Sequence, residues 1–216
     1  MDSKELQKKF KNGEVIEFDT PTIILGSSSP RRSRLFKENN IPHVQIPSTV
    51  DDTELNHLHP HKDVSKKQVI AYAKNMALAK LKPFIGKVVN GAVITMDTTA
   101  YLEGRILEKP ITPECCREQH LFISGKTNIA YTAYAIYCNG KTVCRVMASK
   151  VKIKKLPEDI ITACCSDPET LDAAGYRNLG PIFPYVKIRE SHRANVTGVH
   201  IPFVLKMLKA VGFNQL

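Results

Sequence analysis

The chain has 216 residues, 43% of them hydrophobic, and its formal net charge at pH 7 is +10. This size suits one globular domain or a two-lobed one. The sequence has no run of about 18 apolar residues, so we expect no membrane span. The first 20 residues mix acids with lysines around no apolar core. We therefore expect neither a secretory signal nor a mitochondrial presequence, and a cytoplasmic location.

The positive charge alone leaves three partners open: nucleic acid, an anionic membrane face or an anionic small substrate. Most of the lysines can simply coat the surface. The chain has no tryptophan, and its arginines form no repeat with aromatic residues. These features give little support to a stacking surface for single strands. A basic nucleic-acid-binding module remains an alternative.

The six cysteines include two adjacent pairs but no Cys-x-x-Cys unit of a zinc ribbon. Cys138 and Cys144 flank Asn139-Gly140, a strong signal for a two-residue hairpin turn. With that turn, Cys138 faces Lys141 and Cys144 faces Ala135, so the two thiols are out of register for a disulfide. We expect reduced, mostly structural thiols in a reducing compartment.

The N-terminal part predicts a polar extension and then the start of an α/β domain. The extension, 1–20, should form a short helix and a lead-in strand, and the single domain should span 21–216. Apolar spacing and turn residues predict four elements, in order: a strand at 22–25, a helix at 32–39, a strand at 44–50 and a helix at 64–82. Pro47 places the second strand at a sheet edge or a bulge.

The remaining chain mixes hairpins with helices. The near-continuous apolar run at 88–96 predicts a strand covered on both faces, which ends at Asp97. Five further elements should follow: a hairpin about Glu103-Gly104, a helix from Thr112, a long hairpin at 129–155, a helix at 157–165 and a closing helix at 202–211. The order of α/β units and hairpins predicts a mixed sheet.

The stretch Leu-Gly-Ser-Ser-Ser-Pro-Arg-Arg at 25–32 joins a strand end to a helix start. A helix start leaves four N–H groups unpaired and carries about half a positive charge. Ser29 suits the N-cap and Pro30 the first helical position. Gly26 lets the backbone pass close to a ligand.

Four side chains of this stretch add donors for an anion. Ser27 and Ser28 contribute hydroxyl groups, and Arg31 and Arg32 contribute planar guanidinium groups that fit phosphate oxygens two at a time. The stretch is thus a polyphosphate cradle in physical terms. The alternative is a capped surface helix with two solvated arginines.

A series of stretches resembles the Maf family of nucleotide pyrophosphatases, in order and over nearly the whole chain. The stretches are Leu25–Leu35, Lys74, Met96-Asp97-Thr98, Gly104–Pro110, Ser124–Thr127, Ala174-Gly175-Tyr176 and Asn195–Gly198. The resemblance implies an α/β fold related to inosine triphosphatases, in which helices flank a mixed, twisted sheet and two lobes surround a deep basic groove. It also suggests a homodimer.

The resemblance implies hydrolysis of nucleoside triphosphates to a monophosphate and pyrophosphate, with dTTP, UTP or non-standard nucleotides as substrates. Asp97 would be the general base, with Lys74 and Lys109 adding positive charge to that of the two arginines and Thr98 contacting the substrate. From the residues alone, Asp97 reads as the cap of a turn and Lys74 as a solvated helix lysine. The family match gives both a catalytic role.

Magnesium or manganese would need carboxylate ligands beside the substrate phosphates. Asp97 is one. The second should come from the acidic cluster after the predicted strand at 44–50, where we favour Asp52 over Asp51 and Glu54. The histidines at 57, 59 and 61 read as exposed loop rather than a metal site.

Several positions depart from the family pattern, and two of them bear on the expected pocket or on turnover. Leu179 stands where the family usually has a glutamine associated with the pocket and substrate choice, and its side chain forms no hydrogen bonds. Asn128 stands where a histidine is common. We expect Leu179 to contact the substrate, and the two changes leave open the alternative of a nucleotide-binding protein with little or no hydrolysis.

Overall fold

The computed structural model describes residues 3–50, 62–171, 173 and 180–213. Within these ranges, seven strands form one sheet in the order β2-β1-β3-β5-β6-β7, with β4 paired to β3. The strands are β1 (Ile16–Leu25), β2 (Val44–Gln45), β3 (Val88–Leu102), β4 (Arg105–Leu107), β5 (Thr127–Cys138), β6 (Lys141–Ile153) and β7 (Val186–Ile188). The helices are α1 (Ser3–Lys11), α2 (Pro30–Glu38), α4 (Lys66–Leu81), η1 (Lys82–Phe84), α5 (Pro113–Ile123), α6 (Glu158–Cys165), α7 (Pro168–Leu171), η2 (Phe183–Tyr185), α8 (Glu190–Thr197) and α9 (Ile201–Ala210).

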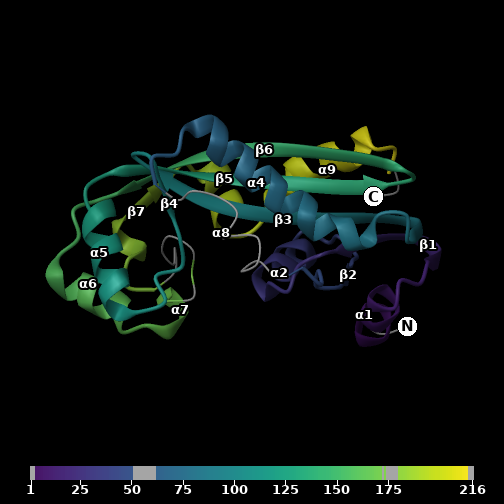
Figure 1. Cartoon of the computed structure of the whole chain (residues 1–216), viewed down its shortest axis with the longest axis horizontal. Coiled ribbons are helices and arrows are strands. Elements are labelled where there is room, and N and C mark those ends of the chain that lie inside the picture. Colours follow the sequence, from purple (N-terminus) through teal and green to yellow (C-terminus); the bar gives the residue numbers. More distant parts are fainter. Residues whose placement is uncertain (1–2, 51–61, 172, 174–179, 214–216) are drawn as a thin grey trace.

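The sheet is mixed, as the sequence predicts. β1 runs parallel to β2 and β3, whereas β3, β5, β6 and β7 pair antiparallel. The long strands β3, β5 and β6 curl along the molecule, with α4 across one face and α9 behind the other (Figure 1). The expected α/β fold, a twisted mixed sheet flanked by helices, is confirmed.

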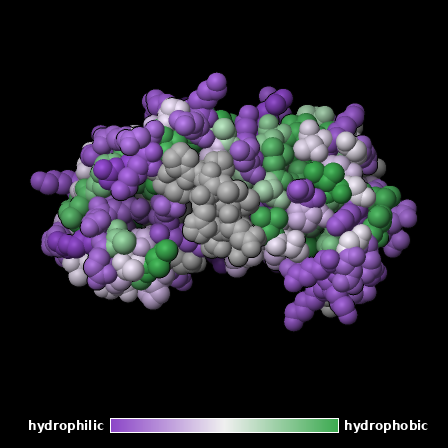
Figure 2. Space-filling model, viewed as in Figure 1, coloured by the Kyte–Doolittle hydropathy of each residue, from purple (hydrophilic) through white to green (hydrophobic). Residues whose placement is uncertain are grey.

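Three apolar clusters hold the helices on the sheet. One joins α1, α4 and η1 to the sheet, a second joins α2 and α9 to the other face, and a third packs α5 and α6 against the far ends of the strands. Figure 1 shows α1 at one end, α2 near the middle, and α5, α6 and α7 at the other end. Hydrophilic residues cover α1 and much of the α5–α6 end on the face in Figure 2.

The N-terminal helix is part of the packed structure. Leu6 and Phe10 of α1 are buried in the first cluster, and the ring of Phe10 meets that of Phe84 edge-on at 5.0 Å between centroids. Edge-to-face aromatic pairs stabilise by about 0.5–1.5 kcal/mol beyond their buried area. The extension at 1–20 therefore contributes to the core although it was predicted only as a polar lead-in.

Several local predictions are confirmed. Ser29 caps α2 and Thr112 caps α5. Asn139 and Gly140 both have positive φ, 49° and 78°, as a type I′ hairpin turn requires.

The register of that hairpin is also as predicted. Cys138 lies opposite Lys141, and Cys144 lies opposite Ala135. The two cysteines are therefore offset along the ladder, and all six cysteines of the chain are free thiols.

Other predictions need correction. β3 does not end at Asp97 but continues to Leu102, because β5 pairs with it through Tyr101 and β4 pairs with its last residues. Asp97 therefore lies inside a strand. β2 has only two residues, since it is an edge strand followed by Pro47. In the described part of the chain, no helix has the length and apolar content needed to span a bilayer.

Candidate active site

A cavity of about 570 Å³ lies between the β1–α2 junction, the middle of β3 and the end of α8. Seven residues that the sequence predicts for the site border this cavity. They are Ser27, Ser29, Arg31, Arg32, Asp97, Thr98 and Lys109. Residues far apart in the sequence, two arginines and a carboxylate, thus meet at one cavity.

The β1–α2 junction has little freedom. Gly26 N–H donates to the Ile94 carbonyl at 2.8 Å, and a Cβ on Gly26 would lie only 2.6 Å from Thr95 Cγ2. Ser29 Oγ accepts the hydrogen bond of the Arg32 N–H, which caps α2. Glycine is therefore required here by close packing, and the chain turns directly from the sheet into the helix start.

Gln45 of β2 braces the same junction. Its Nε2 donates to the carbonyls of Ser27 at 2.8 Å and Ser29 at 3.2 Å. β2 pairs with β1 so that Gln45 lies opposite Leu25, and this register places the amide beside the turn. Gln45 could not be identified from the sequence alone, because only the strand pairing shows its position.

Backbone carbonyls hold the two arginines at the cavity. Arg32 donates from Nη1 to the Met96 carbonyl at 3.3 Å and from Nε to the Gly198 carbonyl at 3.4 Å. Arg31 Nη1 donates to the Thr197 carbonyl at 3.1 Å. These carbonyl contacts fix the positions of both guanidinium groups at the cavity. The end of α8, which the sequence analysis did not predict as a helix, provides two of these anchors.

Asp97 is held through both carboxylate oxygens. Lys80 Nζ lies 2.7 Å from Asp97 Oδ1, and Thr99 Oγ1 donates to Oδ2 at 3.3 Å. The side chains of Lys80 and Asp97 are only 14% and 16% exposed, and both border the cavity. The carboxylate therefore has a fixed orientation at the cavity wall.

The predicted Lys74 does not border the cavity, although it lies on the same helix, α4, as Lys80. Six positions along an α-helix correspond to a rotation of about 240°. Burial raises the pKa of Cys144 in β6 and the charge of Lys74 opposes that rise, which places Lys74 beside β6. Lys80, which the sequence analysis missed, is the lysine that α4 brings to Asp97.

The remaining predicted residues differ in what the structure describes. Thr98 borders the cavity, and its hydroxyl lies 3.0 Å from that of Thr132. Asn128 is buried in β5 and is not among the cavity residues. Four others lie outside the described residues: Asp51, Asp52, Glu54 and Leu179.

Together, the sheet, the helix start and the basic side chains define an α/β protein with a cavity that brings cations together with the oriented carboxylate of Asp97. The family profile described as "Maf-like protein" matches residues 22–211, so the chain belongs to the Maf-like family.

Two curated relatives illustrate the likeness. The "dTTP/UTP pyrophosphatase" of Syntrophus aciditrophicus (strain SB) is 31% identical over 198 residues, which cover 89% of this chain and 91% of the relative. The "dTTP/UTP pyrophosphatase" of Pyrococcus abyssi (strain GE5 / Orsay) is 33% identical over 193 residues, which cover 88% of this chain and 96% of the relative.

Proposed function

We propose that the chain hydrolyses nucleoside triphosphates between the α and β phosphates and releases a nucleoside monophosphate and pyrophosphate. The observation that carries the proposal is the single cavity bordered by Arg31, Arg32 and Asp97. The relatives named dTTP/UTP pyrophosphatase match nearly the whole chain, so we propose dTTP, UTP or closely related non-standard nucleotides as substrates.

The cationic wall has a direct role in this reaction. Hydrolysis brings water onto a phosphorus surrounded by negative oxygens, and catalysis depends on positioning and on neutralising that charge. The cavity offers four cations: Arg31, Arg32, Lys80 and Lys109. The start of α2 adds backbone N–H groups and its helix dipole. These groups bind the triphosphate and stabilise the charge that develops on its oxygens.

Asp97 is the general base in this proposal. Its carboxylate would accept the proton of the attacking water, while the contacts with Lys80 and Thr99 hold the carboxylate plane in place. Asp97 lies opposite Ala133 of β5, between the stretches of β3 that pair with β1 and with β4, so the sheet holds the base in place relative to the cradle. Lys80 takes the place that the sequence analysis gave to Lys74.

A divalent ion fits this donor set. Mg²⁺ and Mn²⁺ prefer hard oxygen ligands, usually one or two carboxylates together with substrate phosphates. Asp97 offers such oxygens at the cavity, and Asp52 is our proposed second ligand. When bound, the ion would supply positive charge to the phosphate oxygens. Since Lys80 already contacts Asp97, the lysine and the ion would share that carboxylate.

Measuring pyrophosphate release from a panel of nucleotides, with Mg²⁺ or Mn²⁺, tests the function. Asp97→Asn should lower kcat by about 10²- to 10⁴-fold, the usual contribution of a general base, and leave nucleotide binding measurable. Asp19→Asn is the matched control, because Asp19 is exposed on β1 and is not among the cavity residues. In isotopically labelled water, the label should enter the monophosphate. Full turnover by Asp97→Asn would refute the role of the base.

Two outcomes would favour the alternatives. Tight triphosphate binding without turnover under any metal would indicate a binding protein. Salt-sensitive binding of DNA or RNA that survives loss of Arg31 and Arg32 would indicate a nucleic-acid-binding module. The homodimer and the cytoplasmic location expected from the sequence stay predictions, which light scattering and cell fractionation would test.

A further inference from the structure

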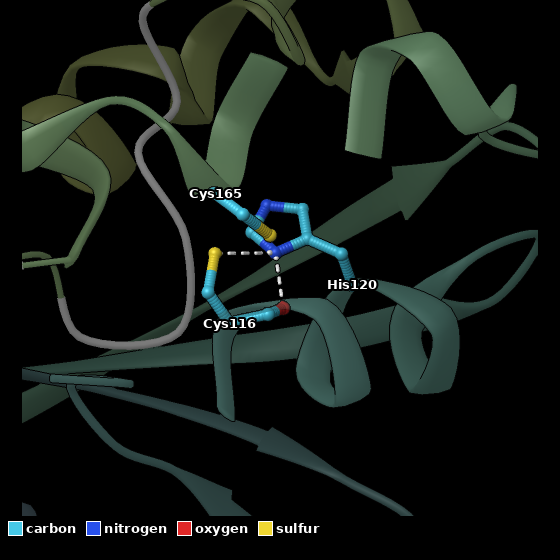
Figure 3. Close-up of side chains that lie close together, drawn as sticks. All are labelled: Cys116, His120 and Cys165. Carbon is cyan, nitrogen blue, oxygen red and sulfur yellow. Dashed lines mark hydrogen bonds between the residues drawn. The ribbon is translucent and has the colours of Figure 1, made fainter. Parts of the chain in front are cut away.

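A second group of reactive side chains lies between α5 and α6, apart from the residues that border the phosphate cavity. Cys116 and His120 come from α5, and Cys165 is the last residue of α6 (Figure 3). Cys116 and His120 are fully buried, and Cys165 is 8% exposed. Two helices thus direct two thiols and one imidazole to the same buried point.

The geometry is close to that of a tetrahedral metal site. Cys116 and His120 are four residues apart, so they lie on the same face of α5. Cys116 Sγ is 3.4 Å from His120 Nδ1, and the three ligand atoms lie within 4.8 Å of one another. Tetrahedral zinc with bonds of about 2.3 Å to sulfur and about 2.05 Å to nitrogen has ligand separations of about 3.6–3.8 Å. The Cys116–His120 pair is thus within about 0.2 Å of this separation, and the widest pair would have to approach by up to about 1 Å.

The imidazole of His120 has hydrogen-bonding capacity that the surrounding protein does not use. Its Nδ1 donates to the Cys116 carbonyl at 2.8 Å, whereas Nε2 is buried and has no hydrogen-bond partner among the described residues. Buried polar atoms normally have a partner, and each exception needs an explanation. Moving the ring proton from Nδ1 to Nε2 breaks no bond at Nε2, but it leaves the Nδ1 lone pair facing the Cys116 carbonyl oxygen at 2.8 Å, so the ring must turn away from that oxygen. Nδ1 is then free to bind an ion.

We propose that Cys116, His120 and Cys165 form a zinc-binding site. Binding of Zn²⁺ releases the two thiol protons to solvent, and the resulting two thiolates balance the charge of the ion. The bound unit is neutral, as a buried position favours. Water completes the four ligands from the side where Cys165 is exposed. Mg²⁺ and Ca²⁺ require oxygen ligands and would not bind here.

The site would join two segments that both reach the phosphate cavity. Lys109 precedes α5 and Glu169 lies in α7, just after α6, and both border the cavity. Between them, the Ile111 N–H donates to the Leu171 carbonyl at 3.4 Å. An ion that ties α5 to α6 would fix this wall of the cavity, and it would act through position rather than through contact with the nucleotide.

The experiment uses the full chain, reduced and stripped of metal by a chelator, and titrates it with Co²⁺ and then Zn²⁺. The expected result is one Co²⁺ per chain with intense tetrahedral and thiolate charge-transfer bands that Zn²⁺ abolishes. Zinc at about 100 times its Kd should raise Tm by about 5 °C or more. Absence of the bands and of any zinc-dependent shift in the wild-type chain would overturn the proposal.

Matched variants locate the ion. Cys165→Ser and His120→Asn should weaken zinc binding at least about 100-fold, because each removes one of three protein ligands. Cys115→Ser is the control, since Cys115 neighbours the site in sequence but is exposed. Asp97→Asn should keep the Co²⁺–thiolate charge-transfer bands of the wild type. Equal zinc affinity in the wild type, Cys165→Ser and His120→Asn would overturn the assignment, and this outcome does not depend on whether the chain hydrolyses nucleotides.

Discussion

Gly26→Ala tests whether close packing behind the β1–α2 junction is required. The new Cβ would lie 2.6 Å from Thr95 Cγ2, which is closer than real Cβ contacts allow, and 3.3 Å from the Ile94 carbonyl. Thr95 cannot easily turn away, because it is fully buried and its Oγ1 donates to the Ala77 carbonyl at 2.7 Å. Overpacking of this kind costs about 1–3 kcal/mol of unfolding free energy.

Thr95→Ser provides the matching change, since it removes the clashing methyl group and keeps the hydroxyl. Alone it should cost about 1 kcal/mol for the lost methyl group. We compare the loss of unfolding free energy in urea. The double variant Gly26→Ala/Thr95→Ser should lose less than the summed losses of the two single variants, by at least about 1 kcal/mol. Additive effects, within about 0.5 kcal/mol, would refute the packing argument.

Two more predictions concern the lysines of α4 and a buried phenol. Lys80→Met should lower kcat about 10- to 100-fold, because it removes a cation from the cavity and one contact of the general base. The kcat of Lys74→Met should remain close to that of the wild type. Equal rates for the two variants in the pyrophosphate assay would contradict this prediction. Burial raises the pKa of Tyr134 to about 12, above the value of about 10 in the unfolded chain. The folded state should therefore lose up to about 2.7 kcal/mol of stability as the pH rises from about 10 to about 12. In urea unfolding, Tyr134→Phe should lack this part of the alkaline loss, and an equal loss in both proteins would show that Tyr134 is not the titrating group.

Features that depend on nearby residues could be predicted from the sequence. The Ser29 cap and the turn at Asn139-Gly140 are set by side chains and backbone angles within a few positions. The turn then fixes the opposite partners along β5 and β6, so the offset of Cys138 and Cys144 followed. The helix start that carries the arginines could be predicted for the same reason.

Features that depend on distant partners could not be predicted. The length of β3 depends on its pairing with β4 and β5. The strand predicted from the apolar run therefore ended too early, at Asp97. A helix pattern gives the spacing of Lys74 and Lys80 but not which one faces the strand that carries the carboxylate. In Cys116-x-x-x-His120, the spacing was present in the sequence, but the third ligand comes from another helix.

The anchoring of Arg31 and Arg32 by the end of α8 has a consequence for biosynthesis. The bonds to the carbonyls of Thr197 and Gly198 span 166 positions. During synthesis from the N-terminus, the cradle leaves the ribosome long before its anchors exist, and domains generally fold as units. A nascent chain that stops before α8 would lack the Thr197 and Gly198 anchors of the two guanidinium groups, so nucleotide processing should begin only after α8 has been synthesised.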